Sequence, residues 1–200
     1  MKVKRRPAVF IDRDGTINEQ MGYINHLSRF RMLPGVGEAI RLLNERDLLV
    51  IVISNQSGVA RGYFPMDLVH RVHDLMKEAL EKSSARVDAV FFCPHYPTGS
   101  VPEYTMQCNC RKPKTGLVEE ACRSFDIDLK NSFVVGDRYT EIELSRRLNI
   151  KGILVRTGYG LGEIEYILPG KPAPDHIADD LLDAARWIIG KVEPGGQRES

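Results

Sequence analysis

Short apolar runs alternate along this chain with longer segments in which apolar residues recur every three or four positions. The short runs are too uniformly apolar for surface helices, so they predict strands buried on both faces. The spaced segments predict helices with one buried side. Strands are expected at residues 8–11, 48–53, 89–92, 133–135 and 152–155, with an extended edge at 175–178. Helices are expected to begin near residues 34 and 65, to span 116–125, to follow residue 137 and to run through residue 187.

This alternation predicts an α/β fold, with one parallel sheet covered by helices on both faces. The chain has 200 residues, which corresponds to one domain at about 150 residues per domain. We therefore expect a single domain over residues 1–192. Residues 193–200 are polar and glycine-rich, so we expect them to form a disordered tail.

Charge and hydrophobicity exclude several classes of protein. Lys and Arg number 28 against 27 Asp and Glu, a net charge of +1, which argues against a nucleic-acid partner. The longest strongly apolar run, 48–53, is far shorter than the ~20 residues that span a bilayer. No apolar segment follows the basic N-terminus, so no secretion signal is expected. We expect a cytoplasmic monomer that acts on a small molecule, without membrane or nucleic-acid partners.

The predicted strands end on residues that catalysis and metal binding use. Ligands bind beyond the carboxyl ends of parallel strands, where this chain places Asp12, Ser54 and Asp137. Asp12 and Asp14 are two residues apart, so both lie on one side of the chain, and Gly15 permits a sharp turn after them. Two close carboxylates repel unless a cation separates them or one keeps a proton. The residues alone leave three interpretations: a Mg²⁺ site, a nucleophile beside an acid, or a capped turn.

The run DRDGT at residues 12–16 after an apolar strand resembles the signature of the haloacid-dehalogenase (HAD) phosphatase superfamily. The resemblance implies a Rossmann-like HAD fold, with Asp12 as nucleophile and Asp14 as general acid and base. It also implies that Mg²⁺ binds Asp12, the backbone carbonyl of Asp14, and Asp137. Ser54 would donate to the phosphoryl group and Lys112 would offset its charge. Glu141 stands where members often carry aspartate, and we expect it to act through a metal-bound water.

A second cluster of metal-ligand residues lies in the polar, proline-rich loop at residues 93–110. Cys93, His95, Cys108 and Cys110 offer three thiolates and an imidazole, the ligand set of a tetrahedral structural zinc site. Such a clip would position the adjacent Lys112. The alternative is four unrelated buried side chains. Cys122 lies on the apolar stripe of its predicted helix and is expected to be a core thiol.

Taken together, DRDGT, the Cys-x-His…Cys-x-Cys loop and the run CRKPK at 110–114 resemble two zinc-bearing phosphatase families over residues 8–160. These are the D-glycero-D-manno-heptose-1,7-bisphosphate 7-phosphatases and the histidinol-phosphate phosphatases. The run NQSG at 55–58 and the segment 18–24 resemble the heptose enzymes. The expected activity is Mg²⁺-dependent hydrolysis of the 7-phosphate through an aspartyl phosphate. The alternative substrate is histidinol phosphate or another small metabolite.

No segment is long enough for a separate cap domain, so loops are expected to roof the site. Groups in two loops would contact sugar hydroxyls: Gln20, Met21, Gly22, Tyr23, Asn55, Gln56 and Ser57. By family resemblance, Arg111 and Arg138 would bind the rest of the substrate, including its distal phosphate, because a guanidinium bonds two oxygens at once. The alternative for Arg138 is a salt bridge to a neighbouring acid.

Overall fold

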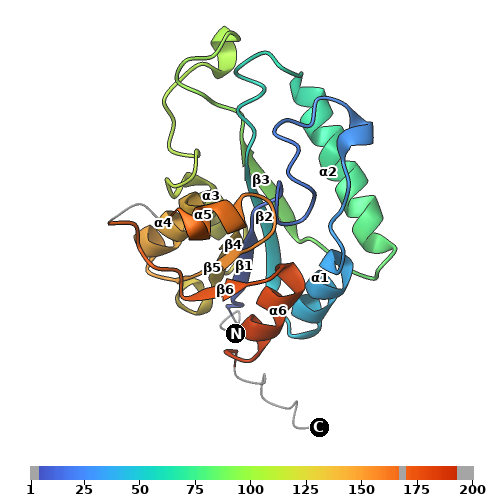
Figure 1. Ribbon diagram of the computed structural model, residues 1–200, viewed down its shortest axis with the longest axis vertical. Helices are drawn as coiled ribbons and strands as arrows, with labels where there is room; N and C mark the ends of the chain where they lie inside the picture. The colour runs from blue at the N-terminus through green and yellow to red at the C-terminus, as the bar shows by residue number, and fades with distance from the viewer. Residues whose placement is uncertain (1–4, 167–169, 193–200) are drawn as a thin grey trace.

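The computed structural model describes residues 5–166 and 170–192, which build a six-stranded sheet in the order β3-β2-β1-β4-β5-β6 (Figure 1). Every neighbouring pair is parallel. Because β1 lies between β2 and β4, the residues that follow it come out at the middle of the sheet. The strands are β1 (Ala8–Ile11), β2 (Leu49–Asn55), β3 (Ala89–Cys93), β4 (Phe133–Gly136), β5 (Lys151–Val155) and β6 (His176–Ala178).

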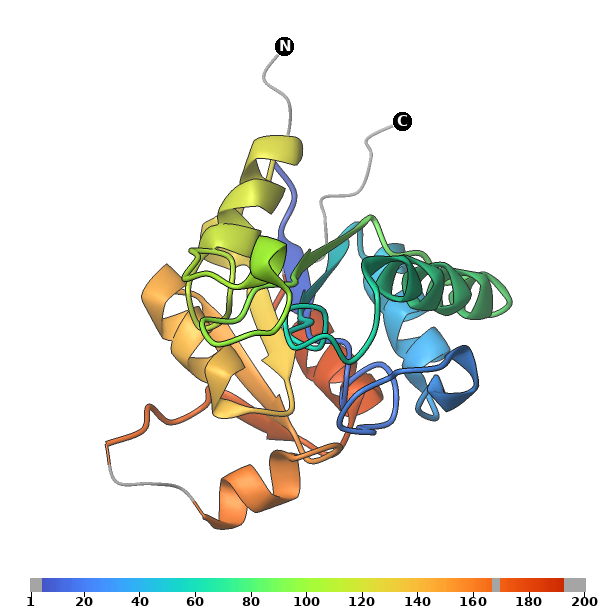
Figure 2. The same cartoon turned by 90° about the horizontal axis from the view of Figure 1, so that it is seen from above.

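Helices cover both faces of this sheet, as Figure 2 shows. The sheet side formed by Val9 and Ile11 packs against α1, α2 and α6, whereas the side formed by Ala8 and Phe10 packs against α3 and α4. Both sides of β1 are therefore buried, which explains its uninterrupted apolar run. The helices are α1 (Val36–Glu45), α2 (Met66–Glu81), α3 (Gly116–Ser124), α4 (Tyr139–Leu148), α5 (Gly160–Glu165) and α6 (Leu181–Ile189).

The predicted α/β class and the predicted strands are confirmed, and the edge segment is the short strand β6. Helix α5 was not predicted, because its six residues include two glycines and bury only Gly160, which leaves no apolar stripe. The predicted tail, 193–200, lies outside the described residues. Among the residues that are described, no helix is long and apolar enough to cross a membrane.

The prediction that Cys122 is a core thiol is wrong, because its side chain is exposed. Helix α3 buries Leu117, Val118 and Ala121. Each residue advances the helix by about 100°, so the position after Ala121 turns away from the sheet. The three-to-one division of the cysteines still holds, since the other three lie together in the 93–110 loop.

Candidate active site

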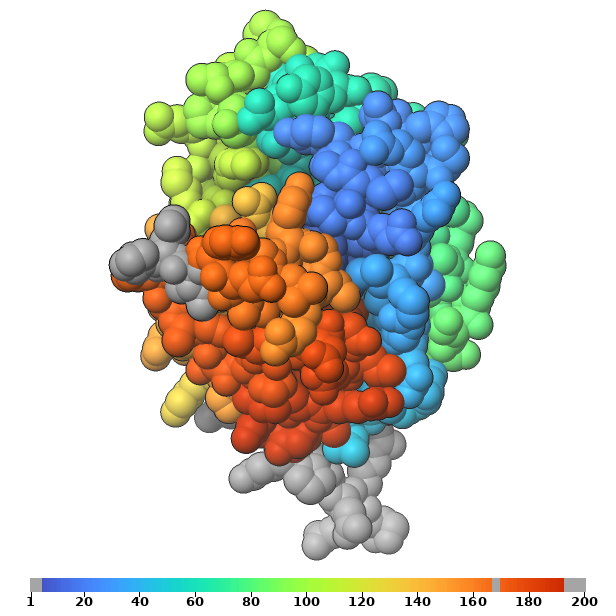
Figure 3. Space-filling model, viewed as in Figure 1, coloured from blue at the N-terminus to red at the C-terminus, as the bar shows by residue number. Residues whose placement is uncertain are grey.

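A cleft of about 420 Å³ opens at the carboxyl end of the sheet. Its floor carries Asp12 after β1, Ser54 in β2 and Lys112 from the loop before α3. Segments from the ends of the first five strands converge around it. Figure 3 shows blue, teal, green and orange surfaces meeting on one face. The described part of the chain has no separate cap domain over the sheet, so these loops form the roof.

Lys112 is the cation at the centre of the floor and is only 3% exposed. Its Nζ donates to Oδ1 of Asp12 at 2.7 Å and to the carbonyl of Ile53 at 2.7 Å. Glu141 Oε1 lies 2.9 Å from the same nitrogen. Burial alone would lower the pKa of Lys112, but the charges of Asp12 and Glu141 raise it above its usual value. The lysine therefore remains an ammonium at the place where a phosphoryl group would meet Asp12.

Three carboxylates surround this ammonium: Asp12, Asp137 and Glu141 each offer an oxygen within 4.8 Å of the others. Burial raises the pKa of Asp12 to about 6 against the opposing charge of Lys112. Burial and then the charge of Asp12 raise the pKa of Asp137 to about 8. With Lys112, the ionised group carries two uncompensated negative charges. Oxygen donors and this excess charge both fit a divalent cation such as Mg²⁺.

Asp137 has a carboxylate oxygen that is available to bind such a cation. Its Oδ2 accepts from the backbone N–H of Tyr159 at 2.9 Å, whereas its buried Oδ1 has no hydrogen-bond partner among the described residues. Gly15 and Gly158 press against this carboxylate at φ of +90° and +58°, and a Cβ on either would come within 2.1 Å of Oδ2. Both positions therefore require glycine.

Asp14 lies beside Asp12 in the same cleft but in a different electrostatic environment. Burial would raise its pKa, yet Arg13 and hydrogen bonds from Asn18 and Gln56 outweigh burial and lower it. Gln56 Nε2 donates at 2.8 Å to both Asp14 Oδ2 and Ser54 Oγ. The two carboxylates of the DxD motif are thus driven apart in pKa, with Asp12 above and Asp14 below the usual value of an aspartate.

Two guanidiniums in the roof flank one aromatic ring. The Cζ of Arg61 lies 3.7 Å from the centroid of Tyr96, and that of Arg111 lies 5.1 Å from it. Nε of Arg61 and Nη1 of Arg111 are buried without a hydrogen-bond partner in the described part of the chain. Unpaired buried donors on cations are costly unless a ligand supplies acceptors. This part of the cleft is therefore suited to an anionic group.

The four predicted zinc ligands come together at the root of the 93–110 loop. Cys93 Sγ lies 3.5 Å from Cys108 Sγ and 3.0 Å from Cys110 Sγ, and His95 Nδ1 lies 3.2 Å from Cys110 Sγ. Two sulfurs on one tetrahedral zinc lie ~3.8 Å apart for bonds of about 2.3 Å. The hydrogen bond between Cys93 and Cys110 lowers the pKa of Cys110 and raises that of Cys93, so Cys110 is the first of the two to become a thiolate. The ligand type, number and spacing fit a structural zinc site.

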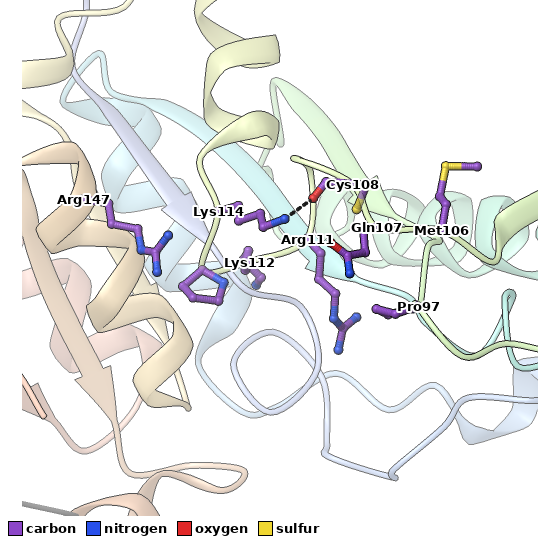
Figure 4. Close-up of a pocket in the computed structure, with 9 residues that line it drawn as sticks. Pro97, Met106, Gln107, Cys108, Arg111, Lys112, Lys114 and Arg147 are labelled. Carbon is purple, nitrogen blue, oxygen red and sulfur yellow. Dashed lines mark hydrogen bonds between the residues drawn. The ribbon is translucent and has the colours of Figure 1, made fainter.

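The zinc-ligand cluster is connected directly to the phosphate-site lysine. Cys110 precedes Lys112 by two residues, and Asn55 at the end of β2 bonds both the N–H and the carbonyl of Lys112, at 3.0 and 3.2 Å. On the outer side of the loop, Lys114 Nζ donates to the Cys108 carbonyl at 2.7 Å (Figure 4). Lys112 is thus fixed between the sheet and this loop.

Comparison with known proteins agrees with this geometry. A family model described as HAD-hydrolase-like matches residues 109–184. The D-glycero-D-manno-heptose-1,7-bisphosphate 7-phosphatase of Thermosynechococcus vestitus is 42% identical over 193 residues, which cover 94% of this chain and 98% of that protein. This chain belongs to the heptose-1,7-bisphosphate 7-phosphatase family. The D-glycero-beta-D-manno-heptose-1,7-bisphosphate 7-phosphatase of Escherichia coli K12 is 37% identical, with 94% and 91% of the two chains covered.

A solved family structure shares the fold. The D,D-heptose 1.7-bisphosphate phosphatase from B. bronchiseptica, complexed with magnesium and phosphate, matches with a TM-score of 0.80 and 30% identity. The match covers 93% of this chain and 99% of that one. The predicted membership of the HAD superfamily and of this family is confirmed.

The structure brings most of the predicted family site residues to the cleft. Met21, Gln56 and Asp137 do not line it: the Met21 carbonyl accepts from Arg29, Gln56 is buried behind Asp14, and Asp137 is fully buried. Arg138 lines the cleft but its side chain is 53% exposed and lies 3.5 Å from Glu163. The predicted residues that line the cleft are Asp12, Asp14, Gln20, Gly22, Tyr23, Ser54, Asn55, Ser57, Arg111, Lys112 and Arg138.

Sequence reasoning missed Arg61, Tyr96, Thr140 and Tyr159, which also line the cleft. Arg61 follows the NQSG run and Tyr96 follows a zinc ligand, so their proximity to predicted site segments was the only available signal. That Glu141 acts through a metal-bound water stays a prediction; its carboxylate also contacts Lys112 directly, a contact that the sequence did not predict. Direct contact is possible because α4 turns this side chain inward, where it is 1% exposed.

Proposed function

We propose that this chain hydrolyses the 7-phosphate of D-glycero-D-manno-heptose 1,7-bisphosphate, and that it does so with bound Mg²⁺. One observation carries the proposal: a single cleft holds Asp12 against Lys112 on its floor and the Arg61–Tyr96–Arg111 group in its roof. The floor suits a phosphoryl group that reacts, and the roof suits a second phosphate that does not. The activity named for the T. vestitus relative agrees with a substrate that carries both.

In the first step, a carboxylate oxygen of Asp12 attacks phosphorus to give an aspartyl phosphate, and Asp14 gives a proton to the leaving sugar oxygen. In the second step, Asp14 takes a proton from water, which attacks the aspartyl phosphate and releases inorganic phosphate. Ser54 and Lys112 bind the phosphoryl oxygens throughout. Phosphoryl transfer depends chiefly on positioning and charge neutralisation, which these side chains supply.

Asp12, the backbone carbonyl of Asp14, and Asp137 would hold Mg²⁺, with Glu141 close by. When bound, the ion neutralises charge on the phosphoryl oxygens during transfer. The unpartnered Oδ1 of Asp137 and the excess negative charge of the cluster support this assignment. Burial and then the charge of Asp12 raise the pKa of Asp137, and a bound cation would offset both.

The distal phosphate would bind between Arg61 and Arg111, with the Tyr96 ring holding both guanidiniums in place by cation–π contact. Arg138 is ion-paired and more exposed, so its contribution would be smaller. Histidinol phosphate carries a cationic amine where the heptose substrate carries its distal phosphate. The arginines in the roof would repel that amine. The carboxylates that line the cleft are those of the floor: Asp12, Asp14 and Glu141.

Cys93, His95, Cys108 and Cys110 would bind one structural zinc, with no open position for catalysis. The clip would keep the 93–110 loop ordered and so hold Lys112 at the floor. We further propose that the enzyme works in the cytoplasm and as a monomer. Its molecular mass in solution tests the oligomeric state.

The deciding experiment measures phosphate release from a panel of heptose 1,7-bisphosphate, heptose 7-phosphate and histidinol phosphate. The expected result is the highest kcat/KM with the heptose bisphosphate. A preference for histidinol phosphate would overturn the substrate assignment and leave the phosphatase chemistry in place.

A further inference from the structure

The arginine inside the DxD motif is one of the largest fully buried side chains of the molecule. Arg13 is 1% exposed, and the nucleophile and the acid–base residue lie on either side of it in sequence. All three of its guanidinium nitrogens are hydrogen-bonded. Burial of a guanidinium is costly unless hydrogen bonds compensate for the lost water, so its partners in the fold stabilise it. Those partners are Asp14 and His73.

Arg13 donates hydrogen bonds to both oxygens of the Asp14 carboxylate. Its Nε donates to Oδ1 at 3.2 Å, and its Nη2 reaches Oδ1 at 2.9 Å and Oδ2 at 2.7 Å. A fork of this kind fixes the plane of a carboxylate as well as its position. Asn18 and Gln56 bond the same two oxygens from other directions, at 3.0 and 2.8 Å. Asp14 is therefore held at the cleft wall by donors from three side chains.

His73 completes the arrangement from helix α2. Its Nε2 lies 3.1 Å from Nη1 of Arg13, and its ring packs edge-on against Phe92 of β3 at 5.2 Å. Burial and then the charge of Arg13 lower the pKa of His73 to about 3. The imidazole is consequently neutral at ordinary pH, and its Nε2 accepts from Arg13. The described cleft lining does not include His73 or Arg13, so both act from behind the wall.

We propose that Arg13 and His73 are positioning residues for the acid–base step, with His73 holding the Arg13 guanidinium and Arg13 holding the carboxylate of Asp14. The inference rests on the aspartate-based phosphatase chemistry proposed above, and it is independent of which sugar is the substrate. A misplaced acid slows transfer to leaving groups that need a proton, whereas p-nitrophenolate leaves without one. Loss of either residue therefore produces a leaving-group-dependent defect.

The experiment compares first-turnover rate constants for two substrates in rapid-mixing assays. One is p-nitrophenyl phosphate, and the other is whichever alkyl phosphate of the panel the wild type hydrolyses fastest. Arg13→Lys keeps the charge but loses the fork, and His73→Leu removes the acceptor. For both variants we expect the alkyl rate to fall at least about tenfold and the p-nitrophenyl rate to stay within about threefold. KM should change little, and His73→Gln, which restores an acceptor, should recover most of the alkyl rate.

Two reference variants calibrate the result. Asp14→Asn defines the pattern of a lost acid, and His70→Leu changes an exposed histidine that packs on the same Phe92. Equal losses for the two substrates, or no loss for either, would show that Arg13 and His73 serve only folding. If Arg13→Lys does not fold, the His73→Leu and His73→Gln pair alone decides the question. Failure of the heptose bisphosphate in the panel, with the leaving-group pattern intact, would contradict only the proposed substrate.

Discussion

Single buried charges set the chemistry of this site, because each meets a specific partner. Asp12 and Asp14 are two residues apart, yet Lys112 lies against one and Arg13 against the other. Burial raises the pKa of Asp12 to about 6, while Arg13 outweighs burial and lowers the pKa of Asp14. The difference arises because Asp12 pairs with Lys112, 100 positions away, whereas Asp14 pairs with its sequence neighbour Arg13.

The first prediction concerns the nucleophile. Asp12→Asn removes the attacking carboxylate, so we expect kcat for phosphate release to fall by at least about 10⁴-fold. The metal-free variant should unfold at a urea concentration no lower than the wild type, because burial already disfavours the charge of Asp12. Near-wild-type turnover would contradict the assignment of Asp12.

A second prediction links His73 to stability against pH. The folded pKa of His73, about 3, lies below its usual value of 6.5, so between these pH values the unfolded chain binds one more proton than the folded chain. The stability due to neutral His73 is therefore present above pH 6.5 and is lost as pH falls toward 3. Between pH 7 and pH 5 the expected loss is about 2 kcal/mol.

Urea unfolding at the two pH values measures this loss in the wild type and in His73→Gln. Between pH 7 and pH 5, the free energy of unfolding of His73→Gln should fall by about 2 kcal/mol less than that of the wild type. His70→Gln, on the exposed side of the same helix, should follow the wild type. Identical pH slopes for His73→Gln and the wild type would show that His73 is protonated in the fold.

At the scale of elements, the 93–110 loop depends on its cysteine–histidine cluster. Its described secondary structure is one short 3₁₀ helix, Pro102–Tyr104, and no described residue of that helix is buried. Its Tyr104 packs against a small apolar cluster of Val59, Phe64 and Val69, and we expect the cysteine–histidine cluster to order the rest of the loop. Removal of a zinc ligand should release it and, through Cys110 and Arg111, displace Lys112.

The third prediction follows from this dependence. Protein purified without added metal should contain about one zinc per chain by elemental analysis. Cys108→Ser should abolish zinc binding, make residues 94–110 sensitive to protease and lower kcat more than about tenfold. Cys122→Ser is the matched control, because that thiol is exposed and distant in sequence from the cluster. Equal activity and protease resistance in zinc-free protein would refute the structural role.

Local patterns predicted the elements of this fold well, since burial of a strand on both faces leaves a continuous apolar run such as residues 8–11. Strand ends also predicted the floor of the site. The Arg13–His73 and Arg61–Tyr96 pairs could not be predicted, because their members are 60 and 35 positions apart and meet only after the sheet has assembled. The error at Cys122 arose because the apolar stripe of α3 ends one residue earlier, at Ala121. The spacing of apolar residues alone does not locate the edge of such a stripe.

Across the whole molecule, a net charge of +1 conceals two opposed regions of one cleft. Carboxylates of Asp12, Asp137 and Glu141 gather at the floor, and the guanidiniums of Arg61 and Arg111 gather in the roof. Arg61 lies in the segment after β2 and is separate from the floor carboxylates, whereas Arg111 adjoins Lys112 of the floor. Substitution of Arg61 should therefore alter substrate binding and leave the floor carboxylates in place.

The fourth prediction uses that separation. Arg61→Gln should raise KM for heptose 1,7-bisphosphate by about 10- to 100-fold, because charged hydrogen bonds contribute about 1.5–3 kcal/mol. KM for heptose 7-phosphate, which lacks the distal phosphate, should change less than about threefold. Arg71→Gln, an exposed arginine on α2, should leave both values unchanged. Equal increases for the two substrates would place the distal phosphate elsewhere.

Thr157 and Gly158, after β5, contact Gly15 of the DxD segment, and this contact has a consequence for synthesis on the ribosome. Thr157 Oγ1 donates to the Gly15 carbonyl at 2.6 Å across 142 positions of chain, and β1 cannot pair on both sides before β4 exists. The nucleophile is therefore translated first and its surroundings last. A nascent chain that stops before residue 157 therefore carries the complete DxD motif but lacks Gly158 and Tyr159, which contact the carboxylate of Asp137.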